Sequence, residues 1–538
     1  MNTLFFGDCL EILREQIPAE SVDLIYLDPP FNSQRNYNLL FKTPKGHAAD
    51  AQITAFEDSW HWGAQAEQEF NEILHQANTA VTELMLSLRR FLRENDLLAY
   101  LTMMASRLLE LHSVLKTSGC LYLHCDPTAS HYLKMVLDGV FGIENFQNEI
   151  CWKRTTTKSD FKQGAKNWPR IHDVVLHYAK NVEKQAAFNQ LFSEYSKDYI
   201  SKKYNHQDLD GRRYMLDNLT APGAGSRGHP EYEFMGVKRY WRYNREKMEK
   251  LLAEGRIIQP HPGAVPRYKR YLDEMHGIAI GDTWDDIFPI NSQAQERLGY
   301  PTQKPLALLE RIIQASSNEG DVVLDPFCGC GTAIYAAHKL SRKWIGIDIT
   351  HLAISIIEQR IKTAFPGIVF EVQGVPKDLA SALDLAKRDK YQFQWWACSL
   401  INAQPYQGKK KGADSGIDGL IYFRDDAGLA KKIIVSVKGG ENVSVSMVRD
   451  LKGVLEREKA QIGLFVTLAP PTQPMLKEAV TAGYYDSPLF GPYLRIQILT
   501  VEGLLNKTER ALYPDLSRGG ETFKQAKPES VDKQDRLL

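Results

Sequence analysis

Apolar and polar positions along the first 150 residues follow a repeated rhythm of helices and strands. The segment GDCLEILREQIP at residues 7–18 places apolar side chains at helical spacing, and the apolar run VDLIYLD at residues 22–28 is typical of a buried strand. The pattern then predicts one long helix over residues 80–116, the strand CLYLHCD and a second helix over residues 130–140. This order of elements predicts an α/β fold.

Two further segments show the same rhythm. Residues 300–370 read as the helix PLALLERIIQAS, the strand DVVLDPF, a glycine-rich turn, the helix TAIYAAHKL, the strand KWIGIDI and the helix THLAISIIEQRIK. Residues 380–508 begin with a helix and continue with the strands LIYF, KIIVSVK, IGLFVTL and LRIQILT, which predicts a separate, smaller α/β domain. Residues 509–538 contain few apolar side chains, so we expect a flexible tail.

Two stretches interrupt the rhythm. Residues 32–63 are polar and irregular, which is long for a passive connection and predicts a lid over a site; an ordinary surface excursion is the alternative. Residues 151–280 hold 24 Lys and Arg against 15 Asp and Glu, and they are dense in Trp and Tyr. Basic residues interleaved with aromatic ones suit a nucleic-acid surface, but the aromatics could equally be the core of a polar α+β insertion.

Composition narrows the class of protein. The 538 residues exceed what one core needs, so several domains are expected, and 66 basic residues balance 66 acidic ones. No apolar stretch reaches the roughly 20 residues that a membrane helix requires, and Asp8 and Glu11 stand where a signal peptide needs an apolar core. We therefore expect a cytoplasmic protein. Cys328 and Cys330 could in principle share a metal, but no second ligand pair accompanies them.

The strand ending at Asp325 runs into the turn DPFCGCGT, and the next strand ends in Asp348. In a Rossmann-like unit, glycines let the backbone approach a ligand, and the carboxylate after the second strand accepts hydrogen bonds from ribose hydroxyls. This arrangement predicts a nucleoside site. The third glycine of a dinucleotide fingerprint is missing, which argues against NAD; a purely structural turn is the alternative.

The tetrapeptide DPPF at residues 28–31 follows the first predicted buried strand. Its two prolines fix an extended stretch whose carbonyls remain free to accept hydrogen bonds from an amino group. The aromatic residue that follows can stack on a flat base. Such a set could hold an exocyclic amino group for in-line attack on a methyl group.

Together these two motifs resemble those of the amino-methylating DNA methyltransferases that use S-adenosylmethionine. The segment YPTQKP at residues 300–305 resembles the TxKP element of that family, and GDTWDDI at residues 281–287 resembles a string found ahead of it. The motif order is similar to the β-class permutation. The resemblance implies a Rossmann-like sheet in permuted order, with residues 1–150 as the catalytic half, 281–370 as the cofactor half and 151–280 as the target-recognition insertion.

The resemblance also implies residue roles. Asp28 and the Pro29 carbonyl would bind the target amino group beside Pro30, and Phe31 would stack on a flipped base. Asp348 would bind the ribose of S-adenosylmethionine, and Asp8 would either contact its adenine or cap a helix. The cofactor pocket would be shaped by Thr302, Lys304, Pro305, Asp325, Phe327, Gly329 and Gly331.

Duplex DNA is the implied substrate, because the target base must leave the stack before its amino group can react. Asp at the first position of the tetrapeptide favours adenine N6 over cytosine N4 in this family, and homodimers are common in it. The competing hypothesis is a nuclease or DNA-binding defence protein whose methyltransferase half is not catalytic.

The C-terminal segment places Asp418 in a turn and Lys438 at the end of the next strand. It resembles the Mrr-like branch of the PD-(D/E)xK endonucleases, which implies Mg²⁺ at Asp418, Lys438 as support for the attacking water, and a restriction-modification role. Position 436 departs from the pattern, because it is Ser where an acidic residue or Gln is usual, and Ser is a poor Mg²⁺ ligand. A DNA-holding domain and a plain structural domain are the alternatives.

Overall fold

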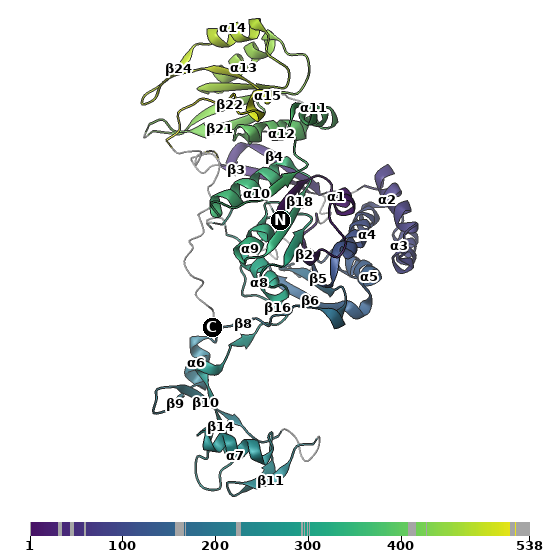
Figure 1. Cartoon of the computed structure of the whole chain (residues 1–538), viewed down its shortest axis with the longest axis vertical. Coiled ribbons are helices and arrows are strands. Elements are labelled where there is room, and N and C mark those ends of the chain that lie inside the picture. Colours follow the sequence, from purple (N-terminus) through teal and green to yellow (C-terminus); the bar gives the residue numbers. More distant parts are fainter. Residues whose placement is uncertain are drawn as a thin grey trace. The chain divides into compact units, whose positions relative to one another are not determined.

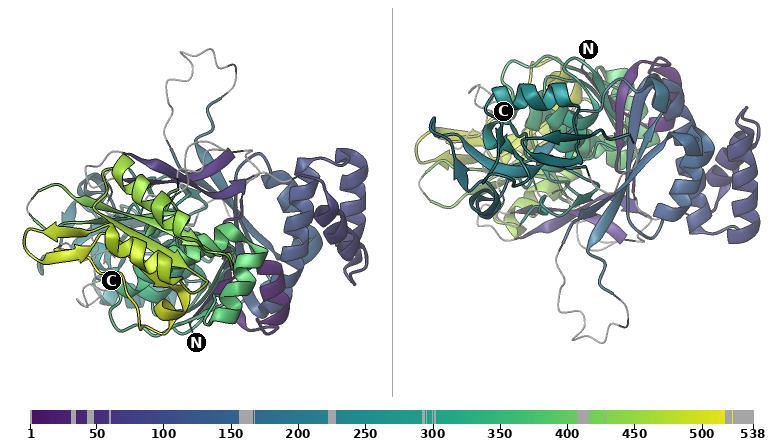
Figure 2. Two further views of the ribbon diagram at one scale, coloured as in Figure 1. Left: turned by 90° about the horizontal axis from the view of Figure 1, so that it is seen from above. Right: turned by 90° about the horizontal axis from the view of Figure 1, so that it is seen from below.

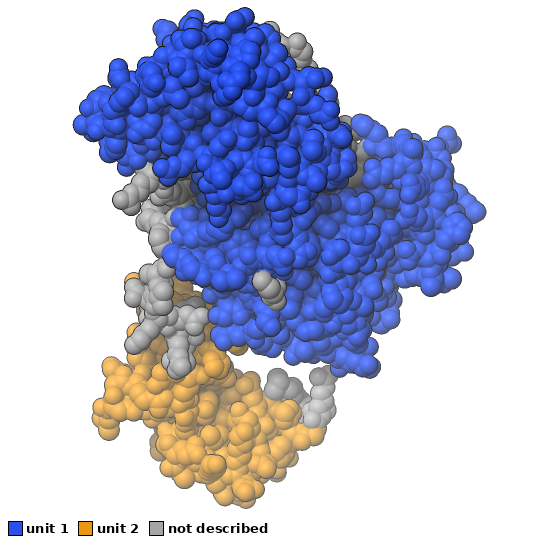
Figure 3. All heavy atoms as spheres, turned by 45° about the horizontal axis from the view of Figure 1, so that its top comes forward, with its two compact units in different colours: residues 1–189, 282–531 blue, residues 190–281, 532–538 orange. Residues whose placement is uncertain are grey.

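The computed structural model describes residues 2–522 apart from short gaps, and side chains are described outside residues 31–60. The gaps are residues 31–34, 43–47, 59–60, 156–165, 167, 222–227, 292–293, 295, 299, 301, 407–415, 427 and 517–521. Two compact units are found, one formed by residues 1–189 and 282–531 and the other by residues 190–281 (Figure 3).

The first unit contains a nine-stranded sheet that combines both ends of the methyltransferase-like segment. Its strand order is β16 (Thr283–Trp284), β6 (Phe146–Lys153), β7 (His172–Ala179), β5 (Leu115–Cys125), β2 (Val22–Leu27), β17 (Val322–Asp325), β18 (Lys343–Asp348), β1 (Thr3–Phe6) and β19 (Glu371–Gln373). The strands from β5 to β19 are parallel, whereas β7 is antiparallel to both of its neighbours. The carboxyl ends of β1, β2, β17 and β18 therefore meet at one edge.

Helices pack on this sheet in two groups (Figures 1 and 2). The first group is α1 (Cys9–Glu15), α2 (Ala64–Leu74), α3 (Thr79–Leu92), α4 (Asp96–Val114) and α5 (Ser130–Phe141), and the second is α8 (Leu306–Ser316), α9 (Thr332–Lys339) and α10 (His351–Ala364). Leu24, Ile25 and Leu27 of β2 have no exposed surface, as expected for a parallel strand covered on both faces. The α/β prediction is confirmed.

The prediction of one long helix over residues 80–116 is wrong, because this segment forms two helices, α3 and α4. Arg93 lies between α3 and α4 with a φ of 58°, a left-handed conformation that ends the first helix. The Asn95 side chain then accepts a hydrogen bond from Leu98 N at 2.9 Å and caps α4. The apolar pattern continues across this break, so spacing alone did not reveal it.

The segment predicted to be an irregular lid contains two paired strands. Strands β3 (Arg35–Lys42) and β4 (Ala48–Asp58) form an antiparallel hairpin. The side chains of this hairpin lie outside the described part of the chain, so the lid stays a prediction.

Residues 190–281 form their own small α+β unit. Its elements are β8 (Phe192–Ser193), α6 (Lys197–Lys203), β9 (His206–Gln207), β10 (Arg213–Asn218), β11 (Glu231–Phe234), β12 (Val237–Tyr240), α7 (Arg245–Ala253), β13 (Ile257–Ile258), β14 (Arg267–Tyr271) and β15 (Ile278–Ala279). The unit begins later than the predicted insertion at residue 151, because β6 and β7 pair within the large sheet.

Several of the aromatic residues that suggested a nucleic-acid surface are buried. Trp241 is fully buried in a cluster with Leu219, Phe234 and Met248. Tyr204 and Tyr214 are also buried, and Trp152 lies in the large sheet; Trp168, by contrast, is 93% exposed. A core role therefore accounts for the buried members of this set.

The C-terminal domain is a five-stranded sheet covered by helices. The sheet order is β20 (Gln404–Pro405), β21 (Gly419–Phe423), β22 (Lys431–Lys438), β23 (Ile462–Thr467) and β26 (Ile496–Thr500); the other elements are α11 (Leu379–Arg388), α12 (Lys390–Leu400), α13 (Val445–Arg457), α14 (Gln473–Thr481), β24 (Tyr484–Ser487), β25 (Gly491–Leu494) and α15 (Val501–Leu505). The four strands expected from sequence are β21, β22, β23 and β26.

The predicted tail begins too early. Leu516 N donates to the Arg424 carbonyl at 2.7 Å, and Glu509 accepts a hydrogen bond from Thr500 N at 2.5 Å. Thr522 is buried and bonds to the backbone of Tyr422. The low apolar content misled the prediction, because these contacts are mostly polar. Within the described residues, no helix is long and apolar enough to span a membrane.

Candidate active site

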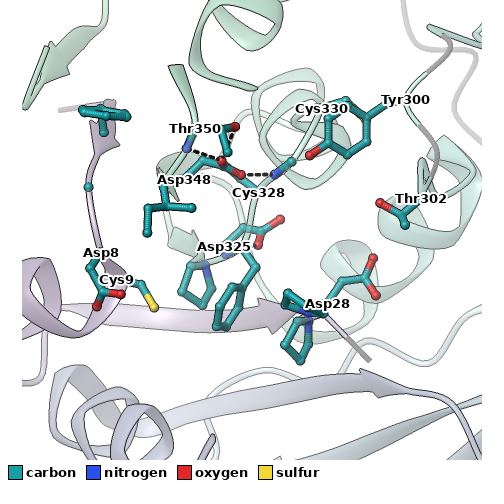
Figure 4. A pocket seen from close by; sticks show the side chains of 18 of the residues that line it. Asp8, Cys9, Asp28, Tyr300, Thr302, Asp325, Cys328, Cys330, Asp348 and Thr350 are labelled. Carbon is teal, nitrogen blue, oxygen red and sulfur yellow. Dashed lines mark hydrogen bonds between the residues drawn. The ribbon is translucent and has the colours of Figure 1, made fainter. Parts of the chain in front are cut away.

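A cavity of about 830 Å³ opens at the sheet edge where β1, β2, β17 and β18 end (Figure 4). Its volume lies within the usual range for small-molecule sites, roughly 300–1,000 Å³. The cavity is lined by most of the residues that the motifs singled out: Asp8, Asp28, Pro29, Pro30, Thr302, Lys304, Asp325, Phe327, Gly329 and Asp348. The permuted halves of the chain thus meet at one site, because their strands are neighbours in the sheet.

Asp28 is the polar group with the most distinctive surroundings. Lys304 Nζ forms an ion pair with its Oδ2 atom, and both side chains are largely buried. The Oδ1 atom is buried and accepts no hydrogen bond from any described residue. A buried carboxylate oxygen without a donor is costly, so this atom is suited to receive a donor from a ligand. Phe31, predicted to stack on the base, lies outside the described residues.

The glycine-rich turn has a backbone that other residues would not adopt. Gly329 and Gly331 have φ values of 50° and 74°, and Gly331 directly precedes α9. A Cβ at Gly331 would lie 2.7 Å from Ile357 Cγ1, so there is no room for a side chain. Gly331 and Pro305 shape the surroundings of the cavity without lining it, whereas Gly329 lines it directly.

Asp348 is fixed by three donors. Gly329 N donates to its Oδ2 atom at 2.9 Å, and Thr350 donates to its Oδ1 atom through N at 2.9 Å and Oγ1 at 2.8 Å (Figure 4). These bonds orient the carboxylate at the cavity. Burial nevertheless raises the pKa of Asp348 to about 6. The pocket can therefore hold a hydroxyl donor most strongly when this group is ionised.

Asp325 is another buried carboxyl group at the cavity. It is only 3% exposed, and burial, reinforced by the negative charges of Asp28 and Asp348, raises its pKa well above the usual value. This shift favours the protonated form of the carboxyl group. Its Oδ1 atom accepts a hydrogen bond from Phe327 N at 3.1 Å, which braces the start of the turn.

Asp8 caps helix α1, which is one of the two roles expected for it. Its Oδ1 atom accepts from Leu10 N at 2.8 Å and caps α1, and Arg107 lies 3.0 Å from its Oδ2 atom. Asp8 also lines the cavity, so a contact to a cofactor adenine stays a prediction. Cys328 and Cys330 are buried thiols, and no cluster of three potential metal-binding side chains occurs among the described residues.

Sequence reasoning missed a buried polar chain behind the cavity. Tyr26 lines the cavity, and its hydroxyl lies 3.1 Å from His124 Nδ1. His124 Nε2 in turn lies 3.2 Å from Asp173. Burial acts to raise the pKa of Asp173, but the His124 hydrogen bond and Arg154, 2.8 Å away, hold that pKa below its usual value. Tyr26, His124 and Asp173 come from three different strands, so no local motif links them. The only sequence signal is that each is a polar residue within or beside a buried apolar run.

At the nuclease-like centre, hydrogen bonds from the protein hold both carboxylate oxygens of Asp418. Asp418 Oδ1 accepts from Gln394 Nε2 at 2.9 Å, and Oδ2 accepts from Val437 N at 2.6 Å. Ser436 is buried and Lys438 is half-buried. Mg²⁺ usually keeps several waters and binds through one or two protein carboxylates. Both carboxylate oxygens of Asp418 accept hydrogen bonds from the protein, and the described residues contain no group of three potential ligands, so the Mg²⁺ role implied by the resemblance stays a prediction.

We expect Asp418→Ala to destabilise the C-terminal domain by about 2 kcal/mol, because the buried Val437 N–H loses its acceptor and Gln394 loses its side-chain acceptor, keeping only the Asp418 carbonyl. Urea unfolding followed by tryptophan fluorescence measures this, since Trp395 and Trp396 lie on α12. The exposed Asp486 provides the control, whose Ala variant should unfold at the wild-type midpoint. Unchanged stability combined with loss of Mg²⁺-dependent DNA cleavage would instead assign Asp418 to metal binding.

Comparison with known proteins gives two family matches. Residues 22–359 match the DNA methylase family, and residues 385–483 match the restriction endonuclease family. The type II methyltransferase M.EcaI of Enterobacter cloacae is 34% identical over 364 residues, which cover 67% of this chain and 69% of that protein. The DNA adenine methyltransferase YhdJ of Escherichia coli K12 is 26% identical over 390 residues, covering 72% of this chain and 92% of that protein.

Among solved structures, TTHA0409 from Thermus thermophilus, assigned as a DNA modification methylase and solved with S-adenosyl-L-methionine, covers 70% of this chain and 100% of that one. The sequence identity is 16% and the TM-score is 0.33. A TM-score this low says nothing about how this chain binds a ligand.

Proposed function

Because the chain belongs to the DNA methylase family, we propose that it transfers a methyl group from S-adenosylmethionine to the N6 amino group of adenine in duplex DNA. The observation that supports this most directly is the buried Asp28 Oδ1 atom, which has no donor among the described residues. An exocyclic amino group supplies such a donor. Adenine is favoured because the tetrapeptide begins with Asp and because the relative YhdJ is an adenine methyltransferase.

In this proposal Asp28 orients the target amino group. Lys304 keeps the Asp28 carboxylate in place through its ion pair, and the Pro29 carbonyl accepts a second hydrogen from the amino group. The lone pair of the amino nitrogen is then directed into the cavity. These residues would act by positioning the amino group and excluding water. Orientation of the reactants alone can lower a barrier by up to about 7–11 kcal/mol.

The cavity fits the proposed methyl donor. Asp348 would accept hydrogen bonds from ribose hydroxyls, and the Gly329 turn leaves room for close approach of the ligand. When bound, S-adenosylmethionine supplies an electrophilic methyl group on a sulfonium sulfur.

The unit formed by residues 190–281 is proposed to recognise the DNA. Lys238 and Arg239 on β12 are exposed and suit contacts with phosphate. Several other cations of this unit, by contrast, pair internally, as Arg212 does with Asp273 at 2.8 Å. The nucleotide sequence recognised depends on which side chains reach base edges. A homodimer stays a prediction from the family resemblance, and a cytoplasmic location stays a prediction from the amino-acid sequence.

Transfer of labelled methyl from S-adenosylmethionine to unmethylated duplex DNA tests the proposal, with the product nucleosides separated and parallel reactions run with and without Mg²⁺. We expect labelled N6-methyladenine in both reactions. Labelled N4-methylcytosine would correct the base, and the absence of any labelled nucleoside on DNA of high sequence diversity would refute methyl transfer. Strand breaks that appear only with Mg²⁺ would show that the C-terminal domain cleaves DNA after all.

Binding of S-adenosylmethionine should weaken as the solution becomes acidic. The pKa of Asp348 is raised to about 6, so this group is ionised above that pH and loses its charge below it. Because ribose hydroxyls donate to the ionised form, we expect the dissociation constant to rise about tenfold between pH 7.5 and pH 5. Calorimetric titration measures it. Asp348→Asn should bind weakly and without this pH dependence; an unchanged pH profile in that variant would contradict the assignment.

A further inference from the structure

The cavity has one wall that does not come from the methyltransferase-like segment. Six residues of the α11–α12 hairpin line it: Leu385, Arg388, Asp389, Tyr391, Gln392 and Trp395. These six lie in the segment that matches the restriction endonuclease family, beyond the part that matches the DNA methylases. Both families therefore contribute side chains to a single cavity.

Specific contacts hold this wall in place. Gln392 Oε1 accepts a hydrogen bond from His351 N at 3.1 Å, at the first residue of α10. His351 in turn stacks on Phe6 of β1, with the ring centroids 3.5 Å apart. Trp395 is buried in a cluster with Tyr300 and two further residues, Cys330 and Leu352. The hairpin is thus anchored to the same strand ends and turn that form the rest of the cavity.

The wall also presents surface that the protein leaves uncovered. Tyr391 is 63% exposed, and Ile349, which follows Asp348, is 56% exposed; both line the cavity. Uncovered apolar area of this kind gains free energy when a flat ring covers it. The hydrogen bond to His351 uses the oxygen of Gln392, which leaves its Nε2 group available to donate to a ligand.

Helix α12 reaches the nuclease-like centre with other side chains. Gln394, which does not line the cavity, donates from Nε2 to Asp418 Oδ1 at 2.9 Å. One turn further on, Cys398 Sγ lies 3.6 Å from the Asp418 carbonyl oxygen. Gln392 and Gln394 are two residues apart on one helix, so the cavity and Asp418 share a single rigid element.

We propose that α12 is part of the cofactor site, where Tyr391 and Gln392 bind the nucleoside end of S-adenosylmethionine, and that cofactor binding is thereby coupled to the Asp418 centre. This inference rests on the proposed methyl-donor site. Coupling between two sites is reciprocal, so if the cofactor stabilises the Asp418 centre, a substitution at the Asp418 end of the helix should also alter cofactor affinity.

Calorimetric titration of the full chain with S-adenosylhomocysteine, the unreactive product, tests the first part. We expect Tyr391→Ala to raise the dissociation constant about tenfold and Gln392→Ala about fivefold. The matched control is Tyr484→Ala, since Tyr484 is 60% exposed and does not line the cavity; it should bind like the wild type, as should Lys387→Ala on α11. Equal affinities in all four variants would overturn the proposal.

Hydrogen exchange tests the coupling with a measurement that a purely structural role would not change. Adding S-adenosylhomocysteine to the wild type should slow exchange of the β22 amides, including Val437 N–H, whose acceptor is Asp418. Gln394→Ala should abolish this protection and shift the cofactor dissociation constant about fivefold, although Gln394 does not line the cavity. Unaltered β22 exchange together with wild-type affinity in Gln394→Ala would refute the coupling.

The two proposals fail in different ways. If the wild-type chain does not bind S-adenosylhomocysteine, the proposed methyl-donor site itself is wrong. If the wild type binds and Asp348→Ala weakens binding, while Tyr391→Ala and Gln392→Ala do not, the cofactor site stands and the role of α12 is refuted.

Discussion

Asp28→Ala should lower the rate of methyl transfer about a hundredfold to a thousandfold, while binding of the cofactor and of DNA stays within a few-fold of wild type. The substitution removes the acceptor that orients the amino group, and loss of one such oriented hydrogen bond at a reacting centre costs roughly 10²–10³ in rate. Lys304 would also lose the partner of its ion pair. Single-turnover transfer of labelled methyl to saturating duplex DNA measures the chemical step, and titrations in parallel measure both affinities.

A matched control separates this effect from damage to the sheet. Asp126 directly follows β5, the neighbour of β2, and does not line the cavity. Asp126→Asn keeps the side-chain oxygen that accepts hydrogen bonds from Thr128 N and Ala129 N in the turn before α5, so its methyl transfer should stay at the wild-type rate. If Asp28→Ala retains more than a tenth of the wild-type rate, Asp28 does not orient the reacting group.

The second large effect is expected at the glycine-rich turn. Gly331→Ala places a Cβ atom in a left-handed conformation with a φ of 74° and within 2.7 Å of Ile357. The conformational strain costs about 1–3 kcal/mol and the overpacking a further 1–3 kcal/mol. Relief requires the turn to move, and Gly329 N then shifts relative to Asp348. We expect weaker binding of S-adenosylmethionine, by about a hundredfold, in calorimetric titration.

Gly320→Ala provides a control that introduces the backbone strain of Gly331→Ala without its steric clash. It has a φ of 85°, but a Cβ there would meet no atom within 4 Å. Gly320→Ala should therefore lower the free energy of unfolding by about 1–2 kcal/mol and leave cofactor affinity unchanged. Equal cofactor affinity in the Gly331 and Gly320 variants would mean that the turn does not shape the pocket.

The sequence predicted the parts of the site that lie within single strand-turn units. Asp28, Asp325 and Asp348 each end a short apolar run, and parallel neighbours place such ends at one edge of a sheet. Local pattern and the motif order were sufficient to expect that they meet. Their chemical roles stay predictions, because position at a cavity does not show which atoms react.

Other features depend on contacts between distant segments and had no local signal. Gln392 and Trp395 lie in a segment assigned to a different domain, so nothing near them in the sequence linked them to the cavity. Composition likewise could not decide whether Trp241 faces solvent or a core, since the same aromatic residues suit both. The strand β7 was hidden within the window taken as an insertion, because its pairing partner β5 lies some fifty residues earlier.

The position of β1 in the large sheet also constrains how the chain folds during synthesis. Thr3 is made long before its partners, because it lies opposite both Ile345 and Glu371. The apolar strand TLFF must therefore wait, without its partners, until β18 and β19 have left the ribosome, and such non-local pairing is slow. Residues 190–281 form their own core from nearby contacts and can fold in the meantime. A chain that stops before residue 343 would expose β1 and one edge of β17 as unpaired strands prone to aggregation.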